Sequence, residues 1–336
     1  MNRDPLQVAV IGLGVGEQHA RAYVKRERCR LRWVLDLDGG RAERLVQELG
    51  HGAVAESLSD LVADPLLDVV SVASYDDDHY RQVTALLEVG KHVFVEKPLC
   101  GSLDELAHIK KIWLVSENAH LGVNLVLRSA PLYIWLRDLI QSGELGELYA
   151  FDGDYLYGRL HKITEGWRKD VPNYSVMQGG GVHLVDLMIW LTGQRPSTVS
   201  GFGNRICSAG TAFQHEDYVA ATYRFESGLI GRITANFGCV HPHQHVLRMF
   251  GTQGTFIYDD RGARLSTSRD PNDPGRSLTL SPLPSTKGDL IPEFVEAILD
   301  SKDTSGETQN EFDVMSACIA VDRALEQEAS VKVEYV

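Results

Sequence analysis

Short apolar runs alternate with helical patterns along the first 125 residues of the chain. Buried parallel strands are typically continuous apolar runs, whereas amphipathic helices repeat apolar residues every three or four positions. The alternation therefore predicts a doubly wound parallel sheet in an α/β domain. The predicted strands are 8–11, 31–36, 69–74, 92–96 and 121–124, and the predicted helices are 17–28, 38–49, 58–62, 80–87 and 103–118.

The pattern changes beyond residue 125, where β-rich segments follow one another without crossover helices. Residues 222–230 predict a hairpin that turns through Ser227-Gly228. We expect a first domain over 1–125 and a second, α+β domain over 126–336 with a large open, mainly antiparallel sheet, whose last helices pack near the first domain. The predicted strands are 149–157, 199–204, 218–225, 229–237, 246–250 and 255–258, and the predicted helices are 131–141, 182–192, 290–299 and 312–327.

Three glycines stand where the first predicted strand becomes a helix. Glycines at such a turn let a phosphate approach the backbone N–H groups at the start of the helix. Asp36 ends the second predicted strand, at the spacing at which a dinucleotide-binding unit places an acid on the ribose hydroxyls. A tight turn without a ligand is the alternative. The residues predicted to hold the dinucleotide here are Gly12, Leu13, Gly14, Val15, Gly16 and Asp36.

The acid at position 36 favours NAD over NADP as the cofactor, because its carboxylate would repel a 2′-phosphate. Arg41 is the only nearby cation in the sequence that could offset this repulsion. Ligands of a doubly wound sheet bind at the carboxyl ends of the strands. Residues at or just beyond the other predicted strand ends complete the cofactor-binding set: Ser74, Tyr75, His79, Glu96, Lys97 and Asn124.

Lys97 and His183 have the chemistry that oxidation of a secondary alcohol requires. The reaction needs a base for the hydroxyl proton and a positive charge that stabilises the developing alkoxide. The Lys97 ammonium would polarise the oxygen; a surface lysine paired with Glu96 is the alternative. His183 stands in the first turn of a predicted helix, whose dipole favours the neutral imidazole that accepts a proton. Asp186 lies on the same face of that helix and could orient the ring.

The composition narrows the class of protein. A formal net charge of −13 argues against a nucleic-acid partner, which would favour a basic face. The sequence contains no apolar run long enough to cross a membrane and no apolar leader after its first residues, so we expect a cytoplasmic protein. The five cysteines are widely spaced and form no CxxC pair, which indicates reduced thiols.

Four motifs together resemble the Gfo/Idh/MocA oxidoreductases, and the likeness covers nearly the whole chain. The motifs are Gly12-Leu13-Gly14, Asp36, Glu96-Lys97-Pro98 and Gly181-Val182-His183-Leu184-Val185-Asp186. The resemblance implies a Rossmann domain and a sheet domain that carries the substrate and often the oligomer contact. It further implies NAD(P)-linked chemistry on sugars, cyclitols or sugar nucleotides.

Two departures from the family pattern affect the predicted site. The third glycine, Gly16, comes one position early, so the loop looks one residue shorter, although we still expect it to bind the pyrophosphate. Gly179 stands where members such as inositol dehydrogenase carry an Asp, four residues before the His. We therefore expect His183 to take the proton directly, and 179–181 to bring the backbone close to the substrate. If the missing Asp limits the rate, replacing Gly179 by Asp should do no harm.

The substrate is expected to meet charged and aromatic side chains. Trp167 and Arg168 lie in a segment that resembles the family's substrate loop, and Arg168 could bind a phosphate or carboxylate or form only an exposed salt bridge. The predicted substrate contacts are Lys97, Tyr155, His161, Trp167, Arg168 and His183, with Tyr155 and Tyr174 as possible support for catalysis. His241, His243 and His245 alternate as strand residues do and should share one face, as a polar wall of the substrate cleft rather than a metal site. We predict no metal.

These features predict an NAD(P)-dependent oxidoreductase that transfers a hydride between a secondary hydroxyl, or the matching ketone, and the nicotinamide. The family also contains NAD-dependent glycosidases and regulators that sense NAD or sugar without catalysis, and both remain alternatives. The partner is a small carbohydrate or cyclitol. We also expect a homodimer or homotetramer, because an open sheet with two apolar faces needs cover on both.

Overall fold

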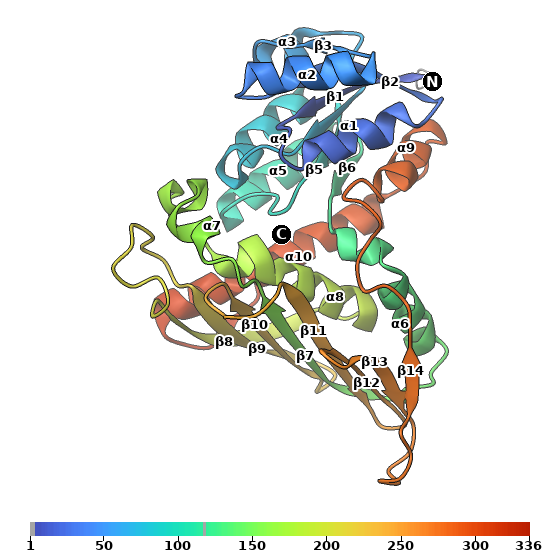
Figure 1. The fold of residues 1–336 in the computed structure, drawn as a ribbon, viewed down its shortest axis with the longest axis vertical. Helices are drawn as coiled ribbons and strands as arrows, with labels where there is room; N and C mark the ends of the chain where they lie inside the picture. The colour runs from blue at the N-terminus through green and yellow to red at the C-terminus, as the bar shows by residue number, and fades with distance from the viewer. Residues whose placement is uncertain (1–3, 117–118) are drawn as a thin grey trace. The chain divides into compact units, whose positions relative to one another are not determined.

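The structure, a computed structural model, describes residues 4–116 and 119–336. Contacts divide the described residues into two compact units, each with its own sheet (Figure 1). Unit 1 contains the described residues through Ser129, together with 284–312 and Val336. Unit 2 contains 130–283 and 313–335. The chain therefore leaves unit 1 near residue 130 and returns to it near residue 284.

Unit 1 is built on a parallel sheet, as the sequence predicts, and its six strands include one, β3, that the sequence pattern did not indicate. Its strand order, β3-β2-β1-β4-β5-β6, is that of a Rossmann fold. Every residue of β4 and β5 is buried, which explains why these strands read as continuous apolar runs. The strands are β1 Leu6–Ile11, β2 Cys29–Leu35, β3 Ala53–Val54, β4 Val69–Val72, β5 His92–Val95 and β6 Leu121–Val123.

Helices cover both faces of this sheet. One group packs on β1 and β2 in a single apolar core: α1 Gly16–Val24, α2 Gly39–Leu49 and α9 Ile291–Leu299. The other group consists of α3 Leu58–Ala63, α4 His79–Glu88 and α5 Leu103–Val115. Asp38 and Ser102 cap α2 and α5, because their side chains accept hydrogen bonds from the N–H groups of Arg41 and Glu105.

Two helices of unit 1, α1 and α5, end before the positions that the sequence predicted. The first helix was expected to reach residue 28 and ends at Val24. The four residues that follow, 25–28, are all charged and offer no apolar side chain to the core, so the chain turns into β2 instead. The helix expected over 103–118 ends at Val115, and residues 117–118 lie outside the described residues.

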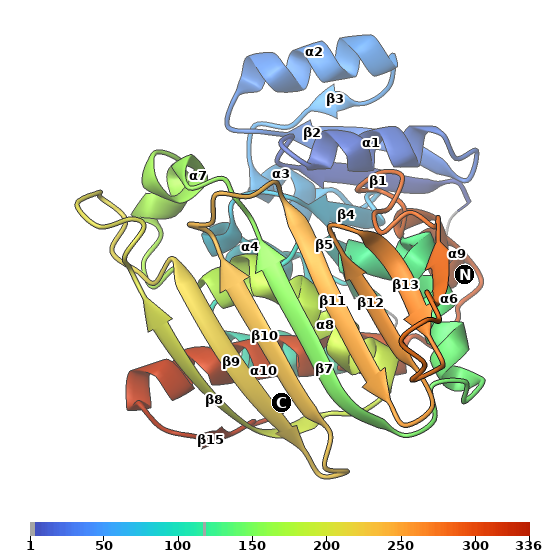
Figure 2. The ribbon, with the colours of Figure 1, turned by 60° about the horizontal axis from the view of Figure 1, so that its bottom comes forward.

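Unit 2 holds a nine-stranded open sheet (Figure 2) in the order β14-β13-β12-β11-β7-β10-β9-β8-β15. Within this sheet, β7–β10 is the only parallel pair among the described strands, so the expectation of a mainly antiparallel sheet is confirmed. The predicted hairpin joins β9 to β10. The strands are β7 Leu148–Leu156, β8 Pro196–Asn204, β9 Tyr218–Phe225, β10 Ile230–Asn236, β11 Gln244–Gly251, β12 Thr255–Asp259, β13 Gly262–Ser266, β14 Arg276–Leu278 and β15 Val331–Lys332.

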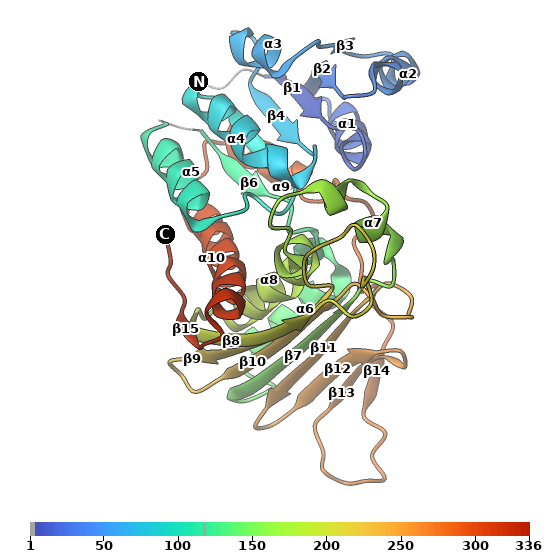
Figure 3. The same ribbon diagram turned by 90° about the vertical axis from the view of Figure 1, so that its left-hand side faces the viewer.

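Helices cover one face of the nine-stranded sheet (Figure 3). They are α6 Pro131–Gln141, α8 Val182–Thr192 and the part of α10, Ser305–Gln327, that follows residue 312. Buried side chains at alternate strand positions, such as Phe151, Ile233 and Met249, point to this face. The last helix begins at Ser305, seven residues before the predicted position 312, and Thr308 and Glu311 in that added part are buried.

The opposite face of this sheet is polar at its centre, so the expectation of two apolar faces is wrong. Asp152 and Asp154 alternate with the buried residues of β7 and point outward. Arg232 donates to Asp152 at 3.2 Å and to Asp154 at 3.0 Å, and Arg248 donates to Asp154 at 3.1 Å. These half-buried ion pairs occupy the surface on which apolar side chains were expected.

A buried hydroxyl pair in unit 1 provides a test of its packing. The hydroxyls of Tyr23 on α1 and Ser71 on β4 lie 3.0 Å apart, and both side chains are fully buried. Tyr23→Phe leaves the Ser71 hydroxyl without its partner, and we expect it to lower the free energy of unfolding by about 1–3 kcal/mol. Ser71→Ala should do the same. In the double variant the loss should be smaller than the sum, because no orphaned hydroxyl remains; additive losses in urea unfolding would contradict this.

Candidate active site

The turn after β1 has the close packing that a dinucleotide cradle requires. Gly12 adopts a φ of 78°, and a side chain there would run into the carbonyl of Ala73. At Gly16, the first residue of α1, a Cβ would lie 2.8 Å from Val10 Cγ1. Gly14, by contrast, is exposed and has open space around the position of a Cβ. The turn is therefore tight toward the sheet and open on the side of the helix N-terminus, which suits a pyrophosphate.

Asp36, the residue directly after β2, holds this glycine turn in place. Its carboxylate accepts hydrogen bonds from the N–H of Leu13 at 2.5 Å and from the N–H of Asp38 at 2.8 Å. The sequence interpretation assigned the side chain only to the ribose. The structure adds a local role, because the same carboxylate fixes the glycine turn against the start of α2.

Glu96 lies at the carboxyl end of β5 within a buried network. Asn124 Nδ2 donates to Glu96 Oε1 at 2.6 Å, and His19 Nε2 lies 3.4 Å from the same oxygen. Burial would raise the pKa of Glu96, but the hydrogen bond and charge of His19, the charge of Lys97 and the Asn124 hydrogen bond lower it to about 2. The network thus keeps a carboxylate beside Lys97. His19 is fully buried, and its ring lies 5.5 Å from that of Phe94.

Lys97 follows this carboxylate directly and precedes Pro98 through a cis peptide bond. The carbonyl of Pro98 accepts from His79 Nδ1 at 2.7 Å, and the His79 side chain is fully buried. His79 therefore holds the Lys97-Pro98 turn.

Two further predicted cofactor residues follow β4. The Ser74 hydroxyl donates a hydrogen bond to Gln82 at 2.7 Å, and Tyr75 is 43 % exposed.

The returning segment of unit 1 contributes contacts that the sequence interpretation missed. Asn124 Nδ2 donates to the carbonyl of Lys287 at 2.8 Å, and the N–H of Lys287 donates to Gln18 Oε1 at 2.8 Å. A Cβ at Gly288 would lie 2.7 Å from Ala22 Cβ, so this segment packs closely on α1. No sequence pattern near residue 287 pointed to it, because the contact joins positions more than 160 residues apart.

In unit 2, a π-helical turn, Met177–Gly181, leads into α8. Its three glycines allow side chains to lie against the backbone. Cβ atoms at Gly179, Gly180 and Gly181 would collide with the Tyr174 hydroxyl, the Tyr155 ring and the Met177 sulfur. All three glycines are buried, so the expectation that they let the substrate approach the backbone is wrong. Aromatic side chains of the protein occupy that space.

Asp322 of α10 anchors the same turn. It accepts from the Ser175 hydroxyl at 2.7 Å and from Gln178 Nε2 at 2.7 Å. Burial raises the pKa of Asp322 to about 6, although both hydrogen bonds act to lower it. The segment just before His183 is therefore fixed from two sides, by α10 and by the aromatic rings.

Tyr174 and Arg168 form a second fixed pair in unit 2. Arg168 Nε donates to the Tyr174 hydroxyl at 2.9 Å, and the guanidinium lies 4.5 Å over the Trp167 ring. These are three of the residues that the sequence indicated, and the structure brings them together. His161, also predicted, is exposed on the short helix α7, His161–Thr164.

His183 belongs to a cluster of rings on the helix-covered side of the sheet. Its ring lies 5.5 Å from that of His245, and the ring of His243 lies 4.9 Å from that of His245. The Tyr155 ring lies 6.3 Å from His183 and 5.3 Å from His245. Burial raises the pKa of Tyr155, so its phenol stays protonated and is unsuited as a base. Asp186 is fully buried one helical turn beyond His183.

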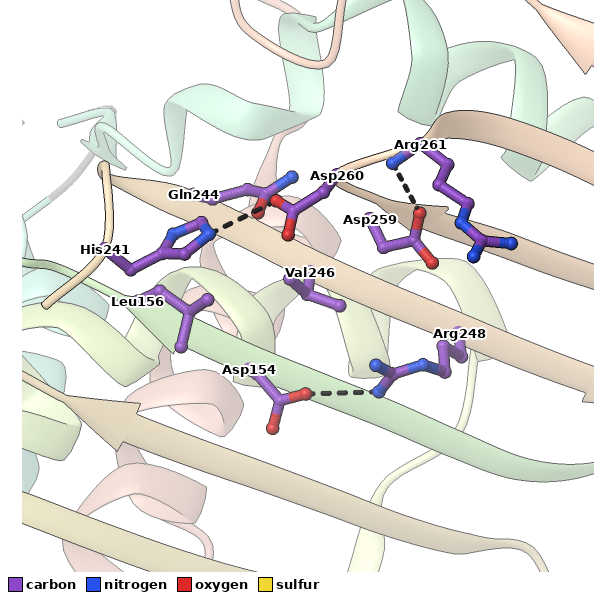
Figure 4. A pocket seen from close by; sticks show the side chains of 9 residues that line it. All are labelled: Asp154, Leu156, His241, Gln244, Val246, Arg248, Asp259, Asp260 and Arg261. Carbon is purple, nitrogen blue, oxygen red and sulfur yellow. Dashed lines mark hydrogen bonds and ion pairs between the residues drawn. The ribbon is translucent and has the colours of Figure 1, made fainter. Parts of the chain in front are cut away.

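His241 departs from the expected arrangement. It was expected to share a face with His243 and His245, but β11 begins only at Gln244, so strand alternation governs neither His241 nor His243, and only His243 lies beside His245. Its ring lies 3.3 Å from Asp260 and lines a hollow of about 370 Å³ on the outer face of the sheet (Figure 4). The hollow's other lining residues include Asp154 and Arg248 of the outer ion pairs.

Residues 4–116 and 119–336 contain no group of three histidine, cysteine, aspartate or glutamate side chains arranged to hold a metal ion. None of their helices is both long enough and apolar enough to cross a membrane.

The first unit has the strand order of a Rossmann fold with a tight glycine turn after β1, and the second is a mixed sheet that carries a cluster of histidine and tyrosine rings. The chain belongs to the GFO/IDH/MocA family. Residues 6–124 match the family profile described as "Oxidoreductase family, NAD-binding Rossmann fold", and residues 133–257 match the "GFO/IDH/MocA C-terminal domain". The protein is thus an oxidoreductase with an NAD-binding fold, as the motifs indicated.

Relatives with named activities are distant in sequence. The chain is 27 % identical to scyllo-inositol 2-dehydrogenase (NAD(+)) of Bacillus subtilis over 302 residues. The matched region covers 86 % of this chain and 80 % of the Bacillus enzyme. The chain is 24 % identical to myo-inositol 2-dehydrogenase of Thermotoga maritima, covering 98 % and 99 %. The structure of levoglucosan dehydrogenase with NADH and levoglucosan superposes on this chain with a TM-score of 0.86 at 19 % sequence identity. The match covers 98 % of this chain and 100 % of the levoglucosan dehydrogenase chain, so the two share a fold.

The Glu96 network generates a pH prediction. The pKa of Glu96 is below its ordinary value of 4.5, so its contribution to stability is present above about pH 4.5 and is lost as the pH falls toward 2. Glu96→Gln should therefore be less stable than the wild type at neutral pH, by up to about 3 kcal/mol, and the difference should shrink in acid. Urea unfolding at several pH values measures both. A difference that does not change with pH would contradict the assignment.

The contact of Tyr174 with Gly179 reverses the expectation that an Asp at 179 does no harm. Gly179→Asp should lower the free energy of unfolding by about 1–3 kcal/mol, because its Cβ meets the Tyr174 hydroxyl. Gly179→Ala is the matched control and should cost nearly as much, since the clash begins at Cβ. Adding Tyr174→Ala should make either substitution less costly in thermal unfolding. A stable Gly179→Asp protein with Tyr174 intact would show the packing argument to be wrong.

Proposed function

We propose that the protein is an NAD-dependent dehydrogenase that interconverts a secondary hydroxyl and a ketone on a cyclitol or sugar. The observation that carries the proposal is Lys97, which follows a carboxylate held by Asn124 and His19 at the end of a Rossmann strand. Membership of an NAD-binding oxidoreductase family supports it, as do the inositol dehydrogenases among the relatives. NAD, when bound, supplies the acceptor for the carbinol hydrogen and its electron pair.

The residues proposed to hold NAD are those of unit 1. The open N-terminus of α1 and the N–H groups of the turn at 12–16 suit the pyrophosphate. Asp36 suits the adenosine ribose hydroxyls and disfavours a 2′-phosphate. Further contacts are proposed for residues at the strand ends: Ser74, Tyr75, Glu96, Lys97 and Asn124.

In the proposed mechanism the Lys97 ammonium binds the reacting oxygen and stabilises the negative charge that develops on it. Glu96 remains ionised beside it, because its pKa lies well below neutral pH. His183 accepts the hydroxyl proton. The π-helical turn Met177–Gly181 runs directly into α8, so His183 lies within a continuous helical segment and the helix-dipole effect expected from the sequence does not apply to it.

The proposed substrate class is a small polyol. Trp167, Arg168 and Tyr174 combine ring faces with N–H and O–H groups, a combination that suits the alternating apolar and hydroxyl surfaces of a sugar or cyclitol. Assembly as a homodimer or homotetramer and a cytoplasmic location stay predictions.

Oxidation assays test the proposal directly. Scyllo-inositol, myo-inositol and levoglucosan should be offered with NAD⁺ and with NADP⁺ while the absorbance of the reduced nicotinamide is followed. We expect reduced cofactor to form in proportion to ketone with at least one of them, and faster with NAD⁺. Consumption of a glycoside without net reduced cofactor would favour the glycosidase alternative. Dinucleotide binding without turnover of any sugar would favour a sensor.

Substitutions test the two assigned residues. His183→Ala should lower kcat by about 10²–10⁴-fold, the usual contribution of a general base. Lys97→Ala should cost at least as much, since it removes a fixed charge next to the reacting oxygen. His183→Ala should bind NAD⁺ nearly as the wild type does in fluorescence titrations. Lys111→Ala, an exposed lysine of α5, is the matched control and should leave kcat unchanged. Turnover of His183→Ala within twofold or threefold of the wild type would assign the base to another group.

A further inference from the structure

The histidines of β11 and the loop before it have no part in the mechanism above, yet two of them form a row with His183. His183 and His245 are buried, with exposed fractions of 7 % and 6 %, and their rings lie 5.5 Å apart. His243 is exposed, and its ring lies 4.9 Å from that of His245. The row thus begins at a buried imidazole and ends at one in contact with solvent.

We propose that His245 and His243 carry the substrate proton from His183 to solvent. This inference rests on the proposed function, in which His183 is the base. Imidazole is suited to such a relay because it accepts a proton on one ring nitrogen and releases one from the other. Ring separations of 4.9 and 5.5 Å are short enough for adjacent rings to exchange a proton directly or through one water molecule.

The surroundings hold the three rings in this order. Tyr155 packs against all of them, with centroid distances of 6.3 Å to His183, 5.3 Å to His245 and 5.2 Å to His243. Tyr157, which stacks on Tyr155, also contacts His243, with ring centroids 5.4 Å apart. Burial raises the pKa of Tyr155, so this central ring packs as a neutral phenol and does not compete for the proton. His245 projects from β11 opposite Tyr155 of β7, which fixes its position in the sheet.

The proton balance explains why a relay is useful. Oxidation of one carbinol breaks its C–H bond, whose electron pair goes to the nicotinamide, and its O–H bond, whose proton goes to His183. One proton must then reach solvent before His183 can act again. A base that is 7 % exposed has little direct access to water, and the relay supplies the path. In ketone reduction the same groups would deliver a proton in the opposite order.

Stopped-flow measurements separate the relay from the chemistry. The substrate is whichever of scyllo-inositol, myo-inositol and levoglucosan the wild type oxidises best. NADH absorbance reports its oxidation, and a pH indicator in weak buffer reports proton release. In the wild type the two signals should rise together. In His245→Phe, which keeps a ring in the cluster, and in His243→Ala, proton release should lag and steady-state kcat should fall by about tenfold or more.

Chemical rescue distinguishes proton transfer from a purely structural role. His245→Ala leaves space for a free imidazole, so added imidazole should restore kcat there and in His243→Ala, but not in His245→Phe. His243 is exposed, so its variant remains a valid test if the buried substitution prevents folding. His241→Phe is the matched control, because this histidine lines the opposite face of the sheet, and it should behave as the wild type.

The results separate the two proposals. If none of the three substrates is oxidised by the wild type, the proposed function fails and the relay fails with it. If the wild type reduces NAD⁺ but His243 and His245 variants release protons in step with NADH, the dehydrogenase stands and the relay is overturned. A loss of kcat that imidazole does not restore in His245→Ala or His243→Ala would also overturn it.

Discussion

The buried carboxylate of Glu96 is the constraint on which the candidate cofactor site depends. An ionised carboxylate inside a Rossmann unit is costly unless opposite charge and hydrogen bonds surround it. His19 of α1, Asn124 after β6 and the neighbouring Lys97 meet that need. Through Asn124 the same network reaches the returning segment at Lys287. One charge therefore orders a helix, two strand ends and a distant loop around the lysine proposed to act on the substrate.

In unit 2 the turn that leads to His183 is held mainly by close packing, whereas in unit 1 the residues around Lys97 are held by a buried charge. The glycines of the turn before α8 have no side chains, so Tyr174 and Tyr155 lie directly on the backbone that leads to His183. Asp322 fixes the same turn through Ser175 and Gln178. Glycine is needed here because the aromatic rings lie against the backbone. At position 179 the Tyr174 hydroxyl occupies the space that the side chain of an aspartate would need.

The two faces of the large sheet have different physical characters. Helices bury the face that carries the histidine row, whereas the other face holds Asp152 and Asp154 in ion pairs with Arg232 and Arg248. Strand alternation separates these sets, because adjacent residues point to opposite faces. The separation places His245 with the proposed base, while Asp154 and His241 border a hollow on the opposite side.

The doubly wound parallel sheet, the mainly antiparallel second sheet and the local motifs could be predicted from the sequence, because apolar periodicity and glycine turns act between near neighbours; the strand order came from the structure. The sequence also indicated Lys97, His183, Tyr155, Tyr174 and Arg168 as chemically suited residues. Only the tertiary structure decided that Glu96 is held by His19 and Asn124, that Lys287 reaches α1, and that His245 lies beside His183 while His241 does not. These contacts join residues far apart in the chain, and they depend on strand register and on where β11 begins, which local patterns do not encode.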